Sequence, residues 1–127
     1  SSKYHLLRVT CLKASDNYPK RYKQLDKNYS NTFLKICAQS ALLSHVVPSL
    51  RSVSVELKNG KLLWQSVFDK DANENDIELT AQASGEFLAN FQEIEFEENN
   101  IVIEFPEKIN HLENLVYYRH EHNYFKE

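Results

Sequence analysis

The sequence contains only two glycines among its 127 residues, and neither Gly60 nor Gly85 has a second glycine near it. A phosphate-cradling loop needs several glycines at fixed spacing, so a nucleotide site of that kind is excluded. No apolar run approaches the roughly 18 residues that a membrane-spanning helix requires, and no signal peptide is recognisable. We therefore expect a cytoplasmic protein that does not interact with a membrane.

Cysteine is scarce as well: Cys11 falls in a strand-like run and Cys37 in a helical pattern. Both have apolar neighbours, which is typical of reduced thiols in the core of a cytosolic protein. A disulfide between them is the alternative, because spacing alone does not establish a pairing.

Signatures of catalysis and of metal binding are missing. No serine or cysteine lies in a nucleophile elbow, and the acidic pairs fall on predicted solvent faces rather than in a cleft such as a glycosidase needs. His120 and His122 would point to one side of an extended strand, but no third metal ligand stands at a recognisable spacing. We predict a non-enzymatic protein without metal or cofactor. A small hydrolase, with a polar cluster in a pocket, is the alternative.

The composition is that of an ordinary globular protein, with 42% hydrophobic and 26% charged residues. A chain of 127 residues can bury a core without disulfides or metals. We therefore predict a single domain over residues 1–127, made of a basic arm at 1–30, a core at 31–121 and a tail at 122–127.

Charge is distributed very unevenly along the chain. Residues 69–107, which we call the acidic segment, contain twelve acids and one base, Lys70. Residues 1–35 contain eight bases and two acids, so the net charge of −3 conceals a polarised molecule. An uneven charge distribution of this kind affects the choice of partners and the association rates rather than the fold. The acidic segment is predicted to be a surface for a cationic partner.

The basic arm joins a strand-like alternation at 6–12 to a polar stretch at 13–30 that includes Tyr18, Tyr22 and Tyr29. Bases interleaved with tyrosines can bind nucleic acid. A solvated arm whose rings lie on the protein body is the commoner outcome, so we expect no nucleic-acid binding.

Two helices are predicted from a period of 3.6 residues. The first begins near Asn31, with Ser30 or Asn31 as its cap, and ends before Pro48. The second runs from about Glu74 to Phe91, and the acids at its start suit the positive end of the helix dipole. The predicted faces are Phe33, Ile36, Cys37, Ser40, Ala41 and Ser44 on the first helix, and Ile77, Ala81, Ser84, Leu88 and Phe91 on the second.

The clearest local pattern is a hairpin. Residues 50–57 alternate apolar with polar side chains, and Asn59-Gly60 is the favoured dipeptide of a type I′ turn. The turn sets the register and places Val55 opposite Trp64 on the buried side of the sheet. Trp64 is therefore predicted to be a core residue.

A second hairpin is predicted with its turn at Asn99-Asn100, because a period of two residues returns after Phe91. That turn would set Glu95 directly against Glu104. Like charges facing each other across strands destabilise a sheet. We expect either basic residues elsewhere in the chain to pair with these two acids, or a cationic ligand to bind there.

These elements predict an α+β fold. An antiparallel sheet of about five strands, formed by the two hairpins and a terminal strand near 115–119, packs against the two main helices. The order of elements in the core is then α-β-β-α-β-β-β.

Three stretches of the core carry a resemblance to known proteins. They read NTFLKICAQSALLSHVVPSLRSVSVELKNGKLLWQSVFD at 31–69, DIELTAQASGEFLANF at 76–91 and PEKINHLENLVYYRHE at 106–121. In the order of elements and in apolar spacing, the core resembles immunity proteins of bacterial contact-dependent growth inhibition and related polymorphic toxin systems. The resemblance covers Asn31–Glu121. It implies a non-enzymatic inhibitor, made in the cytoplasm, that binds and silences the toxin domain of its own strain.

The charge pattern agrees with this implication. Many toxin domains are nucleases, which need basic surfaces to hold phosphates. An acidic face would block such a surface and speed association by electrostatic steering. The alternative is a non-enzymatic adaptor that binds another basic protein. The predicted toxin-binding residues are Glu95, Glu97, Glu104, Asp69, Asp71, Glu74, Asp76 and Glu78.

Overall fold

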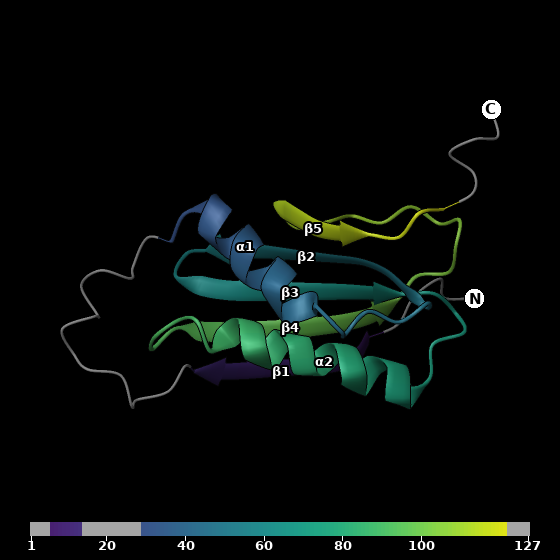
Figure 1. The fold of residues 1–127 in the computed structure, drawn as a ribbon, viewed down its shortest axis with the longest axis horizontal. Helices are drawn as coiled ribbons and strands as arrows, with labels where there is room; N and C mark the ends of the chain where they lie inside the picture. The colour runs from purple at the N-terminus through teal and green to yellow at the C-terminus, as the bar shows by residue number, and fades with distance from the viewer. Residues whose placement is uncertain (1–5, 14–28, 122–127) are drawn as a thin grey trace.

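The computed structural model describes residues 6–13 and 29–121, and for 6–13 the backbone alone. Both helices lie over the same face of one sheet, so the fold is α+β as predicted (Figure 1). The elements in chain order are β1 (Leu6–Lys13), α1 (Asn31–Leu42), β2 (Leu50–Lys58), β3 (Lys61–Phe68), α2 (Glu74–Leu88), β4 (Glu95–Val102) and β5 (Asn114–Tyr118).

The five-stranded sheet is mixed, with the order β1-β4-β3-β2-β5. β4 runs antiparallel to β1 but parallel to β3, and the other pairs are antiparallel. The prediction of an antiparallel sheet is therefore wrong for one pairing. The reason is that α2 connects β3 to β4, and two adjacent strands joined by a crossover helix run in the same direction.

The second predicted hairpin is also wrong. Asn99 and Asn100 lie inside β4, which continues to Val102. The Asn-Asn pair lacks the glycine that a type I′ turn favours. Moreover, β1 and β3 on the two sides of β4 satisfy its backbone hydrogen bonds without a turn. As a consequence, the core contains one strand fewer than predicted after α2.

Glu95 and Glu104 are therefore not cross-strand neighbours. Glu95 is in register with Lys13 of β1 and Lys61 of β3, and not with Glu104. Glu104 lies beyond the far end of the strand, which spans roughly 23 Å at the usual rise per residue.

The first hairpin is confirmed in register and turn type. Asn59 and Gly60 have φ angles of 52° and 79°, as a type I′ turn requires. Val55 pairs with Trp64, and Trp64 is fully buried. The predicted N-terminal strand is present as β1, at the opposite edge of the sheet from β5.

The main core lies between the sheet and the two helices. Trp64 packs on Phe87 of α2 with ring centroids 5.3 Å apart, and Phe87 in turn packs on Phe91. On α2 the predicted residues Ala81, Ser84 and Leu88 are buried, and Ile77 packs on the core while partly exposed. The helix ends at Leu88 and not at the predicted Phe91, which is buried just after it.

On α1 the buried face is rotated from the predicted one. Cys37 and Ala41 are buried as expected, whereas Phe33, Ile36 and Ser40 face outward. The small side chains let the helix approach the sheet closely, and leucines on either side of them fill the remaining space. The buried residues of α1 are Leu34, Cys37, Ala38, Ala41 and Leu42.

The opposite face of the sheet is covered in part by the connection between β4 and β5. In this segment the Asn110 carbonyl accepts a hydrogen bond from Gln65 Nε2 at 3.0 Å, and the Leu112 amide donates to Ser54 Oγ at 2.9 Å. Ile103 and Ile109 pack on Val67 in a small second cluster. The segment thus lies directly against β2 and β3.

Cys37 is a free, buried thiol, and burial raises its pKa. The interpretation of Cys37 as a core residue is confirmed. The side chain of Cys11, most of the basic stretch at 13–30, and His122 lie outside the described residues.

Candidate functional site

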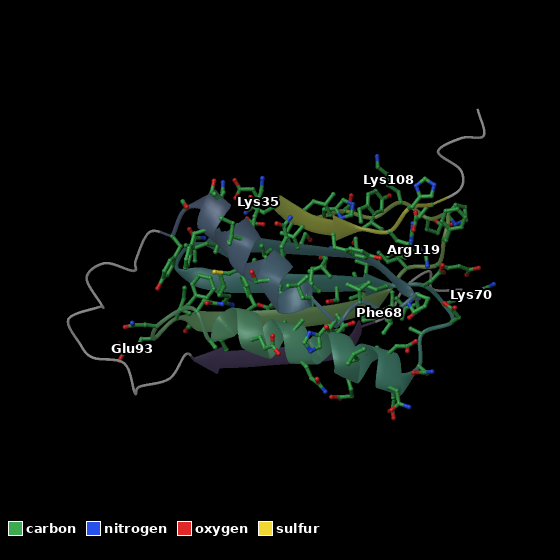
Figure 2. All side chains as sticks on the ribbon, viewed as in Figure 1. Lys35, Phe68, Lys70, Glu93, Lys108 and Arg119 are labelled. Atoms are coloured by element: carbon green, nitrogen blue, oxygen red, sulfur yellow. The ribbon has the colours of Figure 1, made fainter. Side chains whose placement is uncertain are left out.

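The acidic segment does not form one patch in the folded protein. Figure 2 shows Glu93, at its middle, and Lys70, at its start, at opposite ends of the long axis of the molecule. Glu95 and Glu97 belong to the end marked by Glu93, because they begin β4. Glu104 belongs to the other end, where its carboxylate lies 3.3 Å from Lys70 Nζ. The predicted site residues therefore fall into two separate groups.

Asp69, at the end of β3, is committed to internal structure. Its Oδ1 accepts hydrogen bonds from the amides of Lys70 at 2.8 Å and Phe105 at 3.0 Å. Its Oδ2 accepts a hydrogen bond of 2.8 Å from Arg119 Nη2. Burial raises the pKa of this carboxyl, but the hydrogen bonds and the charge of Arg119 outweigh burial, so the pKa falls below its ordinary value of 3.8. Asp69 ties three segments together and is not a surface acid.

The depressed pKa gives a test of this role. A carboxyl with a lowered pKa in the folded state stabilises the protein above its unfolded value, and the contribution is lost as pH falls through the folded value. Asp69→Asn should lower the free energy of unfolding by about 1–3 kcal/mol near neutral pH. The difference from wild type should shrink below about pH 3.8.

Urea unfolding between about pH 7 and pH 3 measures this difference. Asp71→Asn is the matched control, because Asp71 is exposed and two residues away. We expect the control to change stability by less than about 0.5 kcal/mol. A difference for Asp69→Asn that is constant across this pH range would show that the charge of Asp69 is not what stabilises the fold.

Asp76 is also largely structural, as the predicted helix-start role requires. It forms a capping box with Asn73, whose side chain accepts a hydrogen bond of 2.8 Å from the Asp76 amide. Asp76 Oδ2 accepts a second hydrogen bond of 3.0 Å from Ser49 Oγ. This carboxylate fixes the start of α2 and holds it to the loop before β2.

Glu97 and Glu104 are acids in partly exposed ion pairs. Lys61 Nζ lies 3.3 Å from Glu97 Oε1, and Lys70 Nζ lies 3.3 Å from Glu104 Oε2. Pairs of this kind contribute little to stability because water screens them. Both acids remain within reach of a partner, but each already has a base beside it.

The outward side of α2 carries acids without a base on the same helix. The helix contains four acidic residues and neither lysine nor arginine. Glu74, Glu78 and Glu86, which we call the α2 acidic row, are exposed. Asp71 is exposed just before the helix. Of the acidic segment, this stretch and Glu95 are the parts that the fold leaves exposed.

An apolar surface on α1 and the turn that follows it was not predicted from the sequence. Phe33, Ile36, Leu43 and Val46, which we call the α1 stripe, have exposed fractions of 37%, 56%, 72% and 42%. The 3.6-residue period marked part of this face but did not show whether it is turned inward or outward. Ser40 and Ser44, both on the predicted face, are cues that this face is not core.

A buried charge cluster was missed as well, because its members are far apart in the chain. Arg51 donates from Nε and Nη2 to the two oxygens of Glu121 at 2.8 and 3.0 Å, and from Nη1 to the Ile103 carbonyl at 2.8 Å. Arg119 Nη2 reaches Glu121 at 3.2 Å. The cluster satisfies the charges of its own members and fastens the chain end after β5 to the sheet.

Beside this cluster lies a pocket of about 360 Å³ lined by Arg51, Lys108, His111 and Tyr118 among others. Burial and the nearby Arg51 lower the pKa of His111, against a smaller opposing effect of Glu121. The imidazole is therefore held neutral, and the guanidinium of Arg51 is already engaged. Neither His111 nor Arg51 is therefore a free charge that could bind a ligand in this pocket.

The described part of the chain contains neither a cluster of metal ligands nor a membrane-spanning helix. Across residues 29–121, no three His, Cys, Asp or Glu side chains gather in a way that would hold a metal ion. Neither described helix has the length and apolar character needed to cross a bilayer.

An apolar stripe flanked by an acidic helix is typical of a surface that binds another protein. The comparison with protein families identifies which family of proteins this chain belongs to. The chain belongs to the MafI2 immunity protein family, whose match covers residues 31–121. It is thus an immunity protein of a polymorphic toxin system, as the resemblance implied, and its partner is a cognate toxin. Among curated proteins no match to the chain was found.

The family match coincides with structural boundaries. It begins at the first residue of α1 and ends at Glu121, the buried partner of Arg51. It therefore includes both helices, four of the five strands and the charge cluster, and leaves out β1.

Proposed function

We propose that this protein binds the toxin domain of its own strain in the cytoplasm and silences it by occupying a basic surface, and that this toxin is a nuclease. Membership of the MafI2 immunity family supports the toxin partner. The observation that carries the electrostatic part is the α2 acidic row, which stands on a helix without lysine or arginine. The adaptor alternative has no comparable support.

A nuclease must hold the phosphates of its substrate with lysines and arginines. Such a surface attracts an acidic helix as it attracts nucleic acid, and the inhibitor then competes with substrate. Charges at the edge of an interface mainly raise the association rate, and salt screens them. Asp71, Glu74 and Glu78 are the predicted site residues that fit this role best, because Asp69 and Asp76 serve the fold.

Charge reversal on α2 and on β4 tests the proposal. The first variant combines Glu78→Lys and Glu86→Lys on α2, away from the helix start. The second combines Glu95→Lys and Glu97→Lys on β4. Each raises the net charge by four, from −3 to +1, so the two differ in the place of the change and not in its size. The partner is the toxin domain encoded immediately upstream of this chain.

We expect the α2 variant to associate with the toxin roughly ten-fold more slowly at low salt and to lose most of the salt dependence. The β4 variant should associate at a rate close to that of wild type. Association rates at about 0.05 and 0.5 M NaCl give the comparison, and inhibition of nucleic-acid cleavage gives the functional readout. An effect confined to the β4 variant would move the acidic site to Glu95 and Glu97. If neither variant slows association, the acidic surface is not the interface.

A further inference from the structure

We propose that the α1 stripe is the centre of the contact with the toxin and that the α2 acidic row is its border. This inference rests on the proposed function and adds which surface holds the partner once it has arrived. The matching surface of the toxin would be an apolar patch with lysines or arginines along one side.

The stripe contributes little to the core. Ile36 and Leu43 are seven residues apart, which is two helical turns or about 10 Å on one face. Leu34 and Leu42, on the other face, fill the core in their place. Phe33 is only partly free, because its ring stacks on Tyr29 at 5.5 Å and meets Phe91 at 5.6 Å. Ile36, Leu43 and Val46 are thus apolar side chains whose exposure the fold does not require.

The α2 acidic row lies next to the stripe. His45, between Leu43 and Val46, has its Nε2 atom 3.8 Å from Glu86 Oε2. The carbonyl of His45 accepts a hydrogen bond of 3.1 Å from Thr80 Oγ1 of α2. Apolar and acidic surfaces therefore adjoin on the outward side of the helix layer.

Contiguous exposed apolar side chains with polar neighbours are typical of protein interfaces, where the apolar centre excludes water and the border carries charge. The centre mainly sets the dissociation rate, and the charged border mainly sets the association rate. A second copy of this chain fits the surface less well than a toxin does. In a symmetric dimer whose two-fold axis crosses the stripe, the two α2 acidic rows would face each other, and like charges would repel.

The test combines Ile36→Ser and Leu43→Ser in the full chain. The matched control is Leu115→Ser, because Leu115 is 40% exposed and is in register with Ser54, on the sheet face away from the helices. Thermal unfolding checks that both variants fold. If the double variant does not, Leu43→Ser alone replaces it, since Leu43 is the most exposed of these residues.

We expect the complex of the double variant with the upstream-encoded toxin domain to dissociate roughly 10- to 100-fold faster, with the salt dependence of association unchanged. The control should stay within about two-fold of wild type. Dissociation at the wild-type rate would overturn the inference while leaving the proposed function intact. A wild-type protein that does not bind the toxin at all would overturn both. Self-association of wild type that the double variant abolishes would assign the stripe to a dimer instead.

Discussion

Replacing Arg51 with alanine is expected to lower the free energy of unfolding by about 3–5 kcal/mol, because Glu121 would be left buried without its partner. The exposed fractions of the two side chains are 2% and 6%. The loss would include both hydrogen bonds to Glu121 and the one to the Ile103 carbonyl. The guanidinium also lies 5.6 Å from the centre of the Phe105 ring, a contact that alanine cannot replace.

Two further variants separate the charge effect from lost packing. Arg51→Met combined with Glu121→Met removes both charges and should recover much of the stability, since no charge is then buried alone. Lys61→Ala removes the base of the partly exposed pair with Glu97 and should cost about 0–1 kcal/mol. Urea unfolding of all the variants measures these differences. If Arg51→Ala costs no more than Lys61→Ala, the cluster does not hold the fold together.

The buried charge cluster of Arg51, Arg119 and Glu121 affects function because it stabilises the part of the fold that supports α1. Arg51 and Glu121 fasten the chain on both sides of β5, and β5 is the strand on which α1 packs together with β2. Loosening this edge would loosen the support of α1. We therefore expect Arg51→Ala to reduce protection against the toxin in growing cells in proportion to the folded fraction, although Arg51 is not in the proposed contact.

Trp64→Ala should have an effect of similar size, a loss of about 3–5 kcal/mol. The indole is fully buried between β2 and Phe87 of α2, and its removal would leave a cavity beneath the helix layer. Circular dichroism during urea unfolding is the appropriate measurement, because Trp64 is the only tryptophan and the variant lacks its fluorescence. A loss below about 1 kcal/mol would mean that the helices close over the gap.

Two buried serines, Ser66 on the helix-facing side of the sheet and Ser52 on the opposite side, test the contribution of buried hydrogen bonds. Trp64 Nε1 donates a hydrogen bond of 2.7 Å to Ser66 Oγ, so Ser66→Ala would leave a buried donor without a partner, at a cost of about 1–3 kcal/mol. Ser52 is equally buried, but its hydroxyl has no hydrogen-bond partner within the described part of the chain. Ser52→Ala should therefore be neutral or slightly stabilising. Equal losses for the two variants would contradict this role of Ser66.

Local patterns predicted most of the elements. Asn59-Gly60 determined both a turn and a register, because few other residues adopt two successive positive φ angles. The acids before α2 were correctly interpreted in part as helix-start residues, and Asp76 performs that role. The turn predicted at Asn99-Asn100 is wrong because this pair lacks the glycine that such a turn favours. With strands paired on both sides, the backbone continues as a strand there.

The sequence predicted the candidate site less well than it predicted the helices and strands. Acidic residues close in the chain end up at opposite ends of the molecule, because β4 carries the chain along most of its length. A period of 3.6 residues marks a helix face but not its direction, and the small residues of α1 decided which side met the sheet.

By itself, the sequence determined the helices, the first hairpin, the excess of acid in residues 69–107 and the family resemblance, because each of these depends on neighbours along the chain. Only the tertiary structure decided which acids serve the fold, which remain on the surface, and that an apolar stripe lies beside them. Those properties depend on the parallel crossover through α2 and on the distant pairs Arg51–Glu121 and Arg119–Asp69. Contacts of this kind are set when the layers pack, and no spacing in the chain encodes them.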